Sequence, residues 1–313
     1  MSFDLAALAA AVERHGTVAR VVVAATRGSV PRETGAAMLV WPGGQSGTIG
    51  GGRLEYEAAA RALSHQGLTH HPLGPALGQC CGGHVTLLTE HWTAGRLAEL
   101  AGTDIVARGP EPRPLSVARR LDAARARGDR PEPQLLDGWM VEPVTRATVP
   151  VWIWGAGHVG RALIDVLAPI PDLDLTWIDT APERFPDPLP YRVSALPAAV
   201  PERVMPRAPQ SAHHLILTYS HATDLALCHA ALTHGFASAG LIGSDTKWAR
   251  FRKRLGDLGH SAAEIDRIRC PIGQKSLGKH PQAIAVGTAA RLLETVTTGA
   301  RNPWPTHCSA SGA

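Results

Sequence analysis

The residues most suggestive of chemistry are three glycines with the spacing G-x-G-x-x-G, at Gly155, Gly157 and Gly160. They follow the short apolar run Val151–Trp154 and precede a segment with helical periodicity. In such a turn the glycines allow a tight bend, close approach of a phosphate, and close packing of helix on strand. Asp179 ends a second apolar run about twenty residues later, where an acid can bind ribose hydroxyls. This pattern predicts a nucleotide-type phosphate site, although such a fold can also persist without a ligand.

A second glycine-rich turn lies in the first half of the chain, where Gly50, Gly51 and Gly52 precede Arg53. Consecutive glycines expose backbone N–H groups, and the helix expected to follow adds a partial positive charge at its N-terminus. The turn and Arg53 together predict a phosphate site. The alternative is a flexible hairpin loop that binds nothing.

Two further arginines, Arg27 and Arg32, lie in the loop TRGSVPRETG. Its glycines and proline favour turn geometry, and guanidinium groups bind phosphate or carboxylate with two parallel hydrogen bonds. We therefore expect this loop to contribute to an anion site.

An adjacent thiol pair, Cys80 and Cys81, is followed by two glycines. Neighbouring cysteines do not readily bridge each other, and together with His84 they lack the spacing of a structural zinc site. A thiolate in such a loop can bind a soft metal or a sulfur-bearing ligand, and Cys81 is our candidate. The alternative is that Cys81 is a small buried side chain.

A histidine and an aspartate, His221 and Asp224, follow the strong apolar run His214–Ser220. The carboxyl edge of a parallel sheet is where α/β folds bind ligands. These two residues can form an acid–base pair, or they can cap the following helix without any ligand.

The elements that would position these residues form two domains. The first half begins with a helix at Phe3–His15 and a strand at Val18–Ala25, and a helix is expected over Arg53–Ser64. The second half has strand, helix and strand over Val149–Asp179, followed by further buried strands. We predict an N-terminal α/β domain followed by a C-terminal Rossmann-like, doubly wound parallel sheet. The expected bounds are residues 1–146 and 147–300, with a flexible tail at 301–313.

The composition is typical of a soluble globular protein, with 44% hydrophobic and 19% charged residues among 313. No apolar run is long enough to cross a bilayer, and the N-terminus carries acids where a secretion signal is positive, which predicts a cytoplasmic protein. The net charge of +4 comes from scattered arginines, so we expect no nucleic-acid partner and no membrane. Five cysteines, two of them adjacent, suit a reducing compartment.

Seven sequence blocks recur in the order of a known family. They are GSVPRETGAAMLV at Gly28–Val40, GTIGGGRLE at Gly47–Glu55, LGQCCGG at Leu77–Gly83, GAGHVG at Gly155–Gly160, WID at Trp177–Asp179, GLIGSDTKWARFRKRL at Gly240–Leu255, and CPIG at Cys270–Gly273. With these blocks the chain resembles the XdhC/CoxI accessory proteins of molybdenum hydroxylases. Gln274 and the helix start KHPQAIA depart from the usual family pattern, which bears on a partner surface.

The resemblance implies a chaperone without turnover of its own. Such a protein binds molybdenum cofactor (Mo-molybdopterin), protects it while its terminal oxo group is exchanged for sulfur, and inserts it into the molybdenum subunit of xanthine dehydrogenase. The resemblance also implies contact with a cysteine desulfurase, a homodimer, and a cofactor-binding role for residues 1–146.

No catalytic residue is predicted, and Cys81 is the candidate on the metal side. The candidate cofactor-binding residues are Arg27, Arg32, Gly50, Gly51, Gly52, Arg53, Gln79, Cys80, Cys81, Gly155, Gly157, Gly160 and Asp179.

Two other functions compete with this one. The glycine turn with Asp179, and the pair His221 and Asp224, suit an NAD(P)-dependent oxidoreductase. The thiol pair suits a thiol enzyme or a sulfur carrier. The sequence leaves open whether the second domain binds a nucleotide and whether the cofactor is a pterin or a dinucleotide form.

Overall fold

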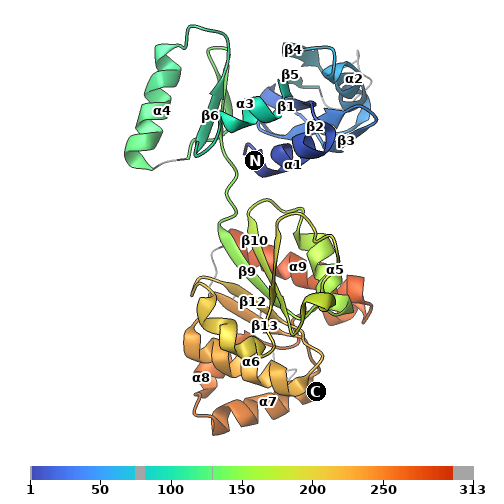
Figure 1. Cartoon of the computed structure of the whole chain (residues 1–313), viewed down its shortest axis with the longest axis vertical. Coiled ribbons are helices and arrows are strands. Elements are labelled where there is room, and N and C mark those ends of the chain that lie inside the picture. Colours follow the sequence, from blue (N-terminus) through green and yellow to red (C-terminus); the bar gives the residue numbers. More distant parts are fainter. Residues whose placement is uncertain (1, 75–81, 129, 299–313) are drawn as a thin grey trace, which may run out of the picture. The chain divides into compact units, whose positions relative to one another are not determined.

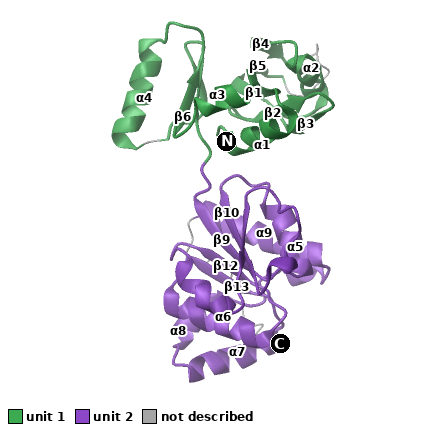
Figure 2. Cartoon of the chain, in the orientation of Figure 1, with its two compact units in different colours: residues 1–145 green, residues 146–313 purple. Residues whose placement is uncertain are grey.

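The computed structural model describes residues 2–74, 82–128 and 130–298 (Figure 1). The chain divides into two compact units, Met1–Thr145 and Arg146–Ala313 (Figure 2). Each unit has hydrophobic clusters of its own. Among the described helices, none combines the length and apolar character needed to cross a membrane.

The first unit is built on a five-stranded antiparallel sheet in the order β3-β2-β1-β5-β4. The strands are β1 (Val18–Arg27), β2 (Ala37–Trp41), β3 (Gly44–Gly47), β4 (Gly67–Pro72) and β5 (His84–Trp92). The helices of this unit are α1 (Leu5–His15), α2 (Gly52–Ala62), α3 (Ala94–Ala98) and α4 (Leu115–Arg127).

The central strand β1 is buried on both faces, because its β-branched side chains alternate between two layers. Val21 and Val23 belong to the cluster that includes Leu54 of α2. Val22 points the other way and packs with Met140. The large sheet is therefore covered on one face by α2 and on the other by a second, smaller sheet.

This smaller sheet has three antiparallel strands in the order β6-β8-β7. Its strands are β6 (Ile105–Arg108), β7 (Gln134–Leu136) and β8 (Trp139–Pro143). Val117 and Leu121 of α4 pack on Trp139 and Val141 of β8, so α4 covers its outer face (Figure 1).

The second unit is a six-stranded parallel sheet in the order β11-β10-β9-β12-β13-β14. This is the strand order of a Rossmann fold, which confirms the predicted fold class. The strands are β9 (Val149–Trp154), β10 (Leu173–Asp179), β11 (Val193–Pro197), β12 (His213–Ile216), β13 (Ser238–Leu241) and β14 (Ile268–Arg269).

Helices cover both faces of this sheet. They are α5 (His158–Leu167), α6 (His221–His234), α7 (Asp245–Asp257), α8 (Ala262–Ile265) and α9 (Pro281–Thr298), with short 3₁₀ helices η1 (Pro182–Arg184), η2 (Pro201–Arg207) and η3 (Lys275–Leu277). Successive residues of β9 point to opposite faces of the sheet. Ile153 packs in the cluster with α5 and α9, and Trp154 packs in the cluster with α6 and α7. A strand buried on both sides explains the continuous apolar run in the sequence.

Candidate functional site

Three glycine-containing loops of the first unit meet at the end of β1. The backbone N–H of Gly83 donates to the carbonyl of Ser29 at 3.1 Å, and a Cβ added to Gly83 would lie 2.6 Å from the carbonyl oxygen of Arg27. A Cβ added to Gly50 would lie 2.6 Å from Cγ of Pro31. The loop after β1 therefore touches both other loops, and glycine is needed where they approach.

The thiol motif lies partly outside the described residues. Gln79, Cys80 and Cys81 fall in the segment 75–81, which the structure does not describe. The residue that follows two positions later, Gly83, is the one that contacts the loop after β1. The roles of these three residues, including Cys81 as a metal ligand, stay predictions.

A carboxylate of the protein organises the glycine turn before α2. Oε2 of Glu55 accepts hydrogen bonds from the hydroxyl of Thr48 at 2.5 Å, from the N–H of Ile49 at 2.9 Å and from the N–H of Gly51 at 3.0 Å. Partial burial would raise the pKa of Glu55, but these hydrogen bonds more than offset it and lower the pKa. The carboxylate of Glu55 would repel an anion bound at this turn. The backbone N–H groups still available to an anion are those in the first turn of α2, which has no side-chain cap.

The three predicted arginines lie on exposed or partly exposed parts of the same unit. Arg27 is the last residue of β1 and is paired in register with His84. Arg32 lies 3.4 Å from Glu33, and Arg53 donates to Glu57 on its own helix at 2.6 Å. Arg53 is 61% exposed, and Nε is the atom that donates to Glu57.

In the second unit, Gly155 and Gly157 lie in the turn between β9 and α5, and Gly160 lies in the first turn of α5. Gly155 has φ of +123°, a conformation that side chains rarely adopt. Gly157 is the N-cap of α5 and leaves the helix start without a side-chain cap. A Cβ on Gly160 would overlap the carbonyl oxygen of Gly155, so this helix can pack against its strand only with glycine.

Asp179 lies at the end of β10 and is 4% exposed. Its Oδ2 accepts from the N–H of Ala156 at 2.5 Å, and its Oδ1 accepts from the N–H of Thr180 at 2.6 Å and from Nε of Arg184 at 3.3 Å. Burial opposes the charged form, but these donors lower the pKa of Asp179. Both carboxylate oxygens are engaged within the protein, which holds the glycine turn in place.

His221 and Asp224 differ in their surroundings at the carboxyl edge of the sheet. Asp224 is 1% exposed, contacts Nζ of Lys247 at 2.5 Å and accepts from the hydroxyl and the N–H of Thr218. His221 is exposed at the start of α6. Asp224 therefore ties α6 to α7, and Lys247 is the partner that the sequence reasoning missed.

Within residues 2–74, 82–128 and 130–298, no three His, Cys, Asp or Glu side chains lie close enough together to hold a metal ion. The two cysteines that the structure describes as free thiols, Cys228 and Cys270, are buried. Burial raises the pKa of Cys270 to about 12. These two thiols are packing residues rather than nucleophiles.

Two family models match the chain. The model described as the XdhC and CoxI family matches residues 11–68, and the model described as the XdhC Rossmann domain matches residues 151–292. Together they fall on both structural units. Among curated proteins, no relative matches the sequence.

Solved structures resemble the chain to different degrees. A crystal structure from Bacillus halodurans, described as a xanthine dehydrogenase, has a TM-score of 0.65 and 16% identity, and the alignment covers 99% of this chain and 98% of that one. At this identity the similarity shows a shared fold. Two weaker similarities cover 50% of this chain: an E. coli tRNA N6-threonylcarbamoyladenosine dehydratase (TM-score 0.34, 14% identity, 89% of that chain) and a short-chain dehydrogenase/reductase from Veillonella parvula in complex with NADP (TM-score 0.28, 10% identity, 90% of that chain).

Proposed function

Because this chain belongs to the XdhC and CoxI family, we propose that it is an accessory protein of a molybdenum hydroxylase. Its task is to bind molybdenum cofactor as cargo, to protect it while its terminal oxo group is exchanged for sulfur, and to insert it into the molybdenum subunit of xanthine dehydrogenase. It performs no turnover of its own. A cysteine desulfurase supplies the sulfur, and the working form is a homodimer.

The observation that carries this proposal is the meeting of three loops in the first unit. The loop after β1 is hydrogen-bonded to Gly83 through the carbonyl of Ser29, and its Pro31 side chain packs against Gly50 of the glycine turn before α2. We assign cargo binding to this unit, with domain bounds of 1–146 and 147–300 and a tail at 301–313.

The described residues suit such a cargo. Arg27 and Arg32 carry guanidinium groups at the loop cluster, and guanidinium binds phosphate and polar ring edges with directed hydrogen bonds. At Gly50 and Gly83 the lack of a side chain lets these loops pack closely against Pro31 and Val30 of the loop after β1. Cys81 precedes Gly83 by two residues, and its thiolate would supply the soft ligand that molybdenum or its labile sulfur prefers.

The test is to purify the full chain anaerobically from cells that make the cofactor, and to measure molybdenum by mass spectrometry and pterin by fluorescence after oxidation. We expect both to co-purify in equal amounts. Absence of both would overturn the proposal.

A pair of double variants tests the arginines. Arg27→Gln with Arg32→Gln is expected to lower cofactor content at least about tenfold, because charge-assisted hydrogen bonds are lost. The matched control is Arg119→Gln with Arg127→Gln, which removes the same charge from exposed positions on α4. An equal loss of bound cofactor in the two double variants would argue against a binding site at the loops. Cys81→Ser, with Cys80→Ser beside it, tests the thiol in the same assay.

A second candidate, an NAD(P)-dependent oxidoreductase, is favoured by the Rossmann strand order and by the uncapped N-terminus of α5. Calorimetry with NAD and NADP separates the two functions. Binding of either dinucleotide at micromolar concentration would support the oxidoreductase, and no binding at millimolar concentration would exclude it.

A further inference from the structure

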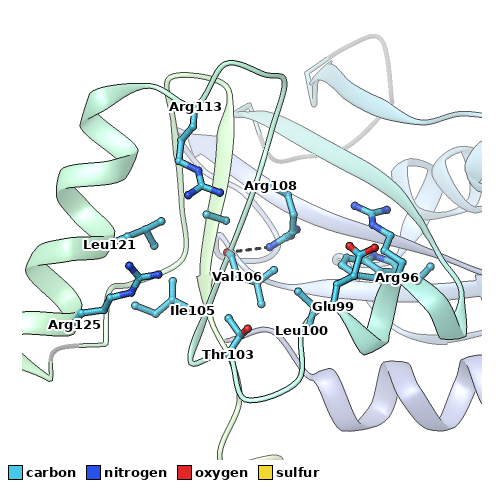
Figure 3. Close-up of a pocket in the computed structure, with 12 residues that line it drawn as sticks. Arg96, Glu99, Leu100, Thr103, Ile105, Val106, Arg108, Arg113, Leu121 and Arg125 are labelled. Atoms are coloured by element: carbon cyan, nitrogen blue, oxygen red, sulfur yellow. Dashed lines mark hydrogen bonds between the residues drawn. The ribbon is translucent and has the colours of Figure 1, made fainter.

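An arginine-lined cavity of about 330 Å³ runs along β6 in the first unit (Figure 3). The strand is at the edge of the small sheet, and the cavity is bordered by α3 and β5 on one side and by α4 on the other. Glu99 is the one carboxylate among its lining residues, all of which the structure describes. The arginines that line it are Arg96, Arg108, Arg113 and Arg125. The lining therefore carries an excess of positive charge.

Behind this cavity lies a buried ionic network with more cations than anions. Arg108 contacts Glu90 at 2.9 Å and Glu142 at 2.5 Å. Arg20 forms two hydrogen bonds with Glu142, at 2.9 and 2.7 Å, and Arg96 contacts Glu90 at 3.1 Å. Three guanidinium groups thus share two carboxylates. Arg20 and Arg108 are 3% and 9% exposed, whereas Arg96, which lines the cavity, is 32% exposed.

The other wall adds two arginines outside this network. Arg113 lies 5.1 Å from the ring centre of Trp139. Arg125 is in the last turn of α4, and its contact with Asp122 at 3.6 Å is at the surface, with both side chains about three-quarters exposed. Such a pair contributes little. Figure 3 shows both arginines on the α4 side, facing the strand that carries Arg108.

The network alone explains why Arg20 and Arg108 are present, because they join the two sheets. It does not explain why Arg113 and Arg125 border the same space. A second cavity of about 570 Å³ shares Arg96, Arg108 and Arg113 and extends to Trp139. Guanidinium groups that line a cavity can bind the oxygens of a phosphate.

We propose that the cavity along β6 is a binding site for a small phosphate-bearing anion, distinct from the glycine loops. Trp92 and Leu100 on one side of the cavity, and Leu121 on the other, give the remainder of such a molecule apolar surface to pack against. This proposal does not depend on the function proposed above.

The test uses the full chain at low ionic strength and isothermal calorimetry with inorganic phosphate and with pyrophosphate. We expect saturable binding, tighter for pyrophosphate, and a higher melting temperature in its presence. Arg113→Gln with Arg125→Gln is expected to weaken binding at least about tenfold, because two charge-assisted contacts are lost. Both side chains lie outside the buried network, so folding is retained.

Arg119→Gln with Arg127→Gln is the matched control, since both residues are exposed on α4 and do not line the cavity. Equal weakening by this control, or no saturable binding of either anion by the unmodified chain, would overturn the proposal. Cofactor content of the Arg113/Arg125 variant then identifies the source of the phosphate. Loss of cofactor assigns the site to a phosphate of the cargo, whereas unchanged cofactor content assigns it to a separate ligand.

Discussion

A carboxylate of the protein itself holds each of the two glycine turns. Glu55 accepts the N–H groups of Ile49 and Gly51 in the first unit, and Asp179 accepts the N–H of Ala156 in the second. Each carboxylate occupies donors that a bound phosphate would otherwise use. The turns are thereby held in one conformation without a ligand, and the backbone donors left for an anion are those at the starts of α2 and α5.

Glu55→Ala tests this role. We expect the free energy of unfolding of the first unit to fall by about 1–3 kcal/mol, because two backbone donors lose their acceptor. Urea denaturation followed by circular dichroism measures it. Glu57→Ala on the same helix is the control, and it is expected to cost less than about 1 kcal/mol because it removes an exposed pair with Arg53.

The pH dependence of this contribution has a definite sign. The pKa of Glu55 is lowered in the folded protein, so the stabilisation is fully present above the unfolded-state pKa and is lost as the pH falls through the folded-state pKa. The difference in stability between the unmodified chain and the Ala variant is expected to shrink below about pH 4. A difference that stays constant down to pH 2 would show that the charge of Glu55 is not involved.

At the scale of elements, some helical glycines are required because a side chain would clash with a neighbouring segment, and others are not. A methyl group at Gly160 would overlap the carbonyl oxygen of Gly155, whereas one at Gly256, in α7, would meet nothing within 4 Å. We expect Gly160→Ala to destabilise the second unit by at least about 1–3 kcal/mol through overpacking. Gly256→Ala is expected to stabilise it by about 0.5–1 kcal/mol. Thermal unfolding measures both, and equal effects of the two variants would contradict the packing argument.

The two sheets of the first unit are joined by the carboxylate of Glu142 on β8. Burial would raise the pKa of Glu142, but Arg20 and Arg108 more than offset it and lower the pKa. Glu142→Gln leaves two buried guanidinium groups short of a counter-charge, and we expect a loss of about 3–5 kcal/mol of stability. Urea denaturation measures it, with Glu132→Gln at an exposed position as the control. A loss below about 1 kcal/mol would show that water or rearrangement compensates the arginines.

The elements that the sequence predicted well are those whose signals are local. The strand, helix and strand over Val149–Asp179 could be read from apolar periodicity and glycine spacing. Short strands could not: β3 has four residues, β4 is mostly polar, and β14 has two. The strands β7 and β8 are separated only by a turn with positive φ at Asp137 and Gly138, which apolar periodicity does not reveal.

In the candidate sites, too, the local features could be predicted from the sequence and the long-range contacts could not. Glycine turns and their arginines were visible in the sequence, but the partners of the buried charges were not. Arg20 and Glu142 are 122 positions apart, and only the packing of β8 on β1 brings them together. Glu55 follows the glycine turn by three residues, yet its hydrogen bonds to that turn depend on the backbone path. Long-range pairing of this kind has no signature in one sequence.

For the whole molecule, the separation of cores has a testable consequence. Each unit buries its own apolar clusters: β1 with α2 in the first, and β9 with α5 and α6 in the second. A domain with its own core can fold alone. We expect the fragments 1–145 and 146–298 each to show a cooperative urea transition by circular dichroism, and the Glu142→Gln substitution to destabilise only the first. An unfolded fragment 146–298 beside a folded full chain would show that the Rossmann unit needs the first unit to complete its core.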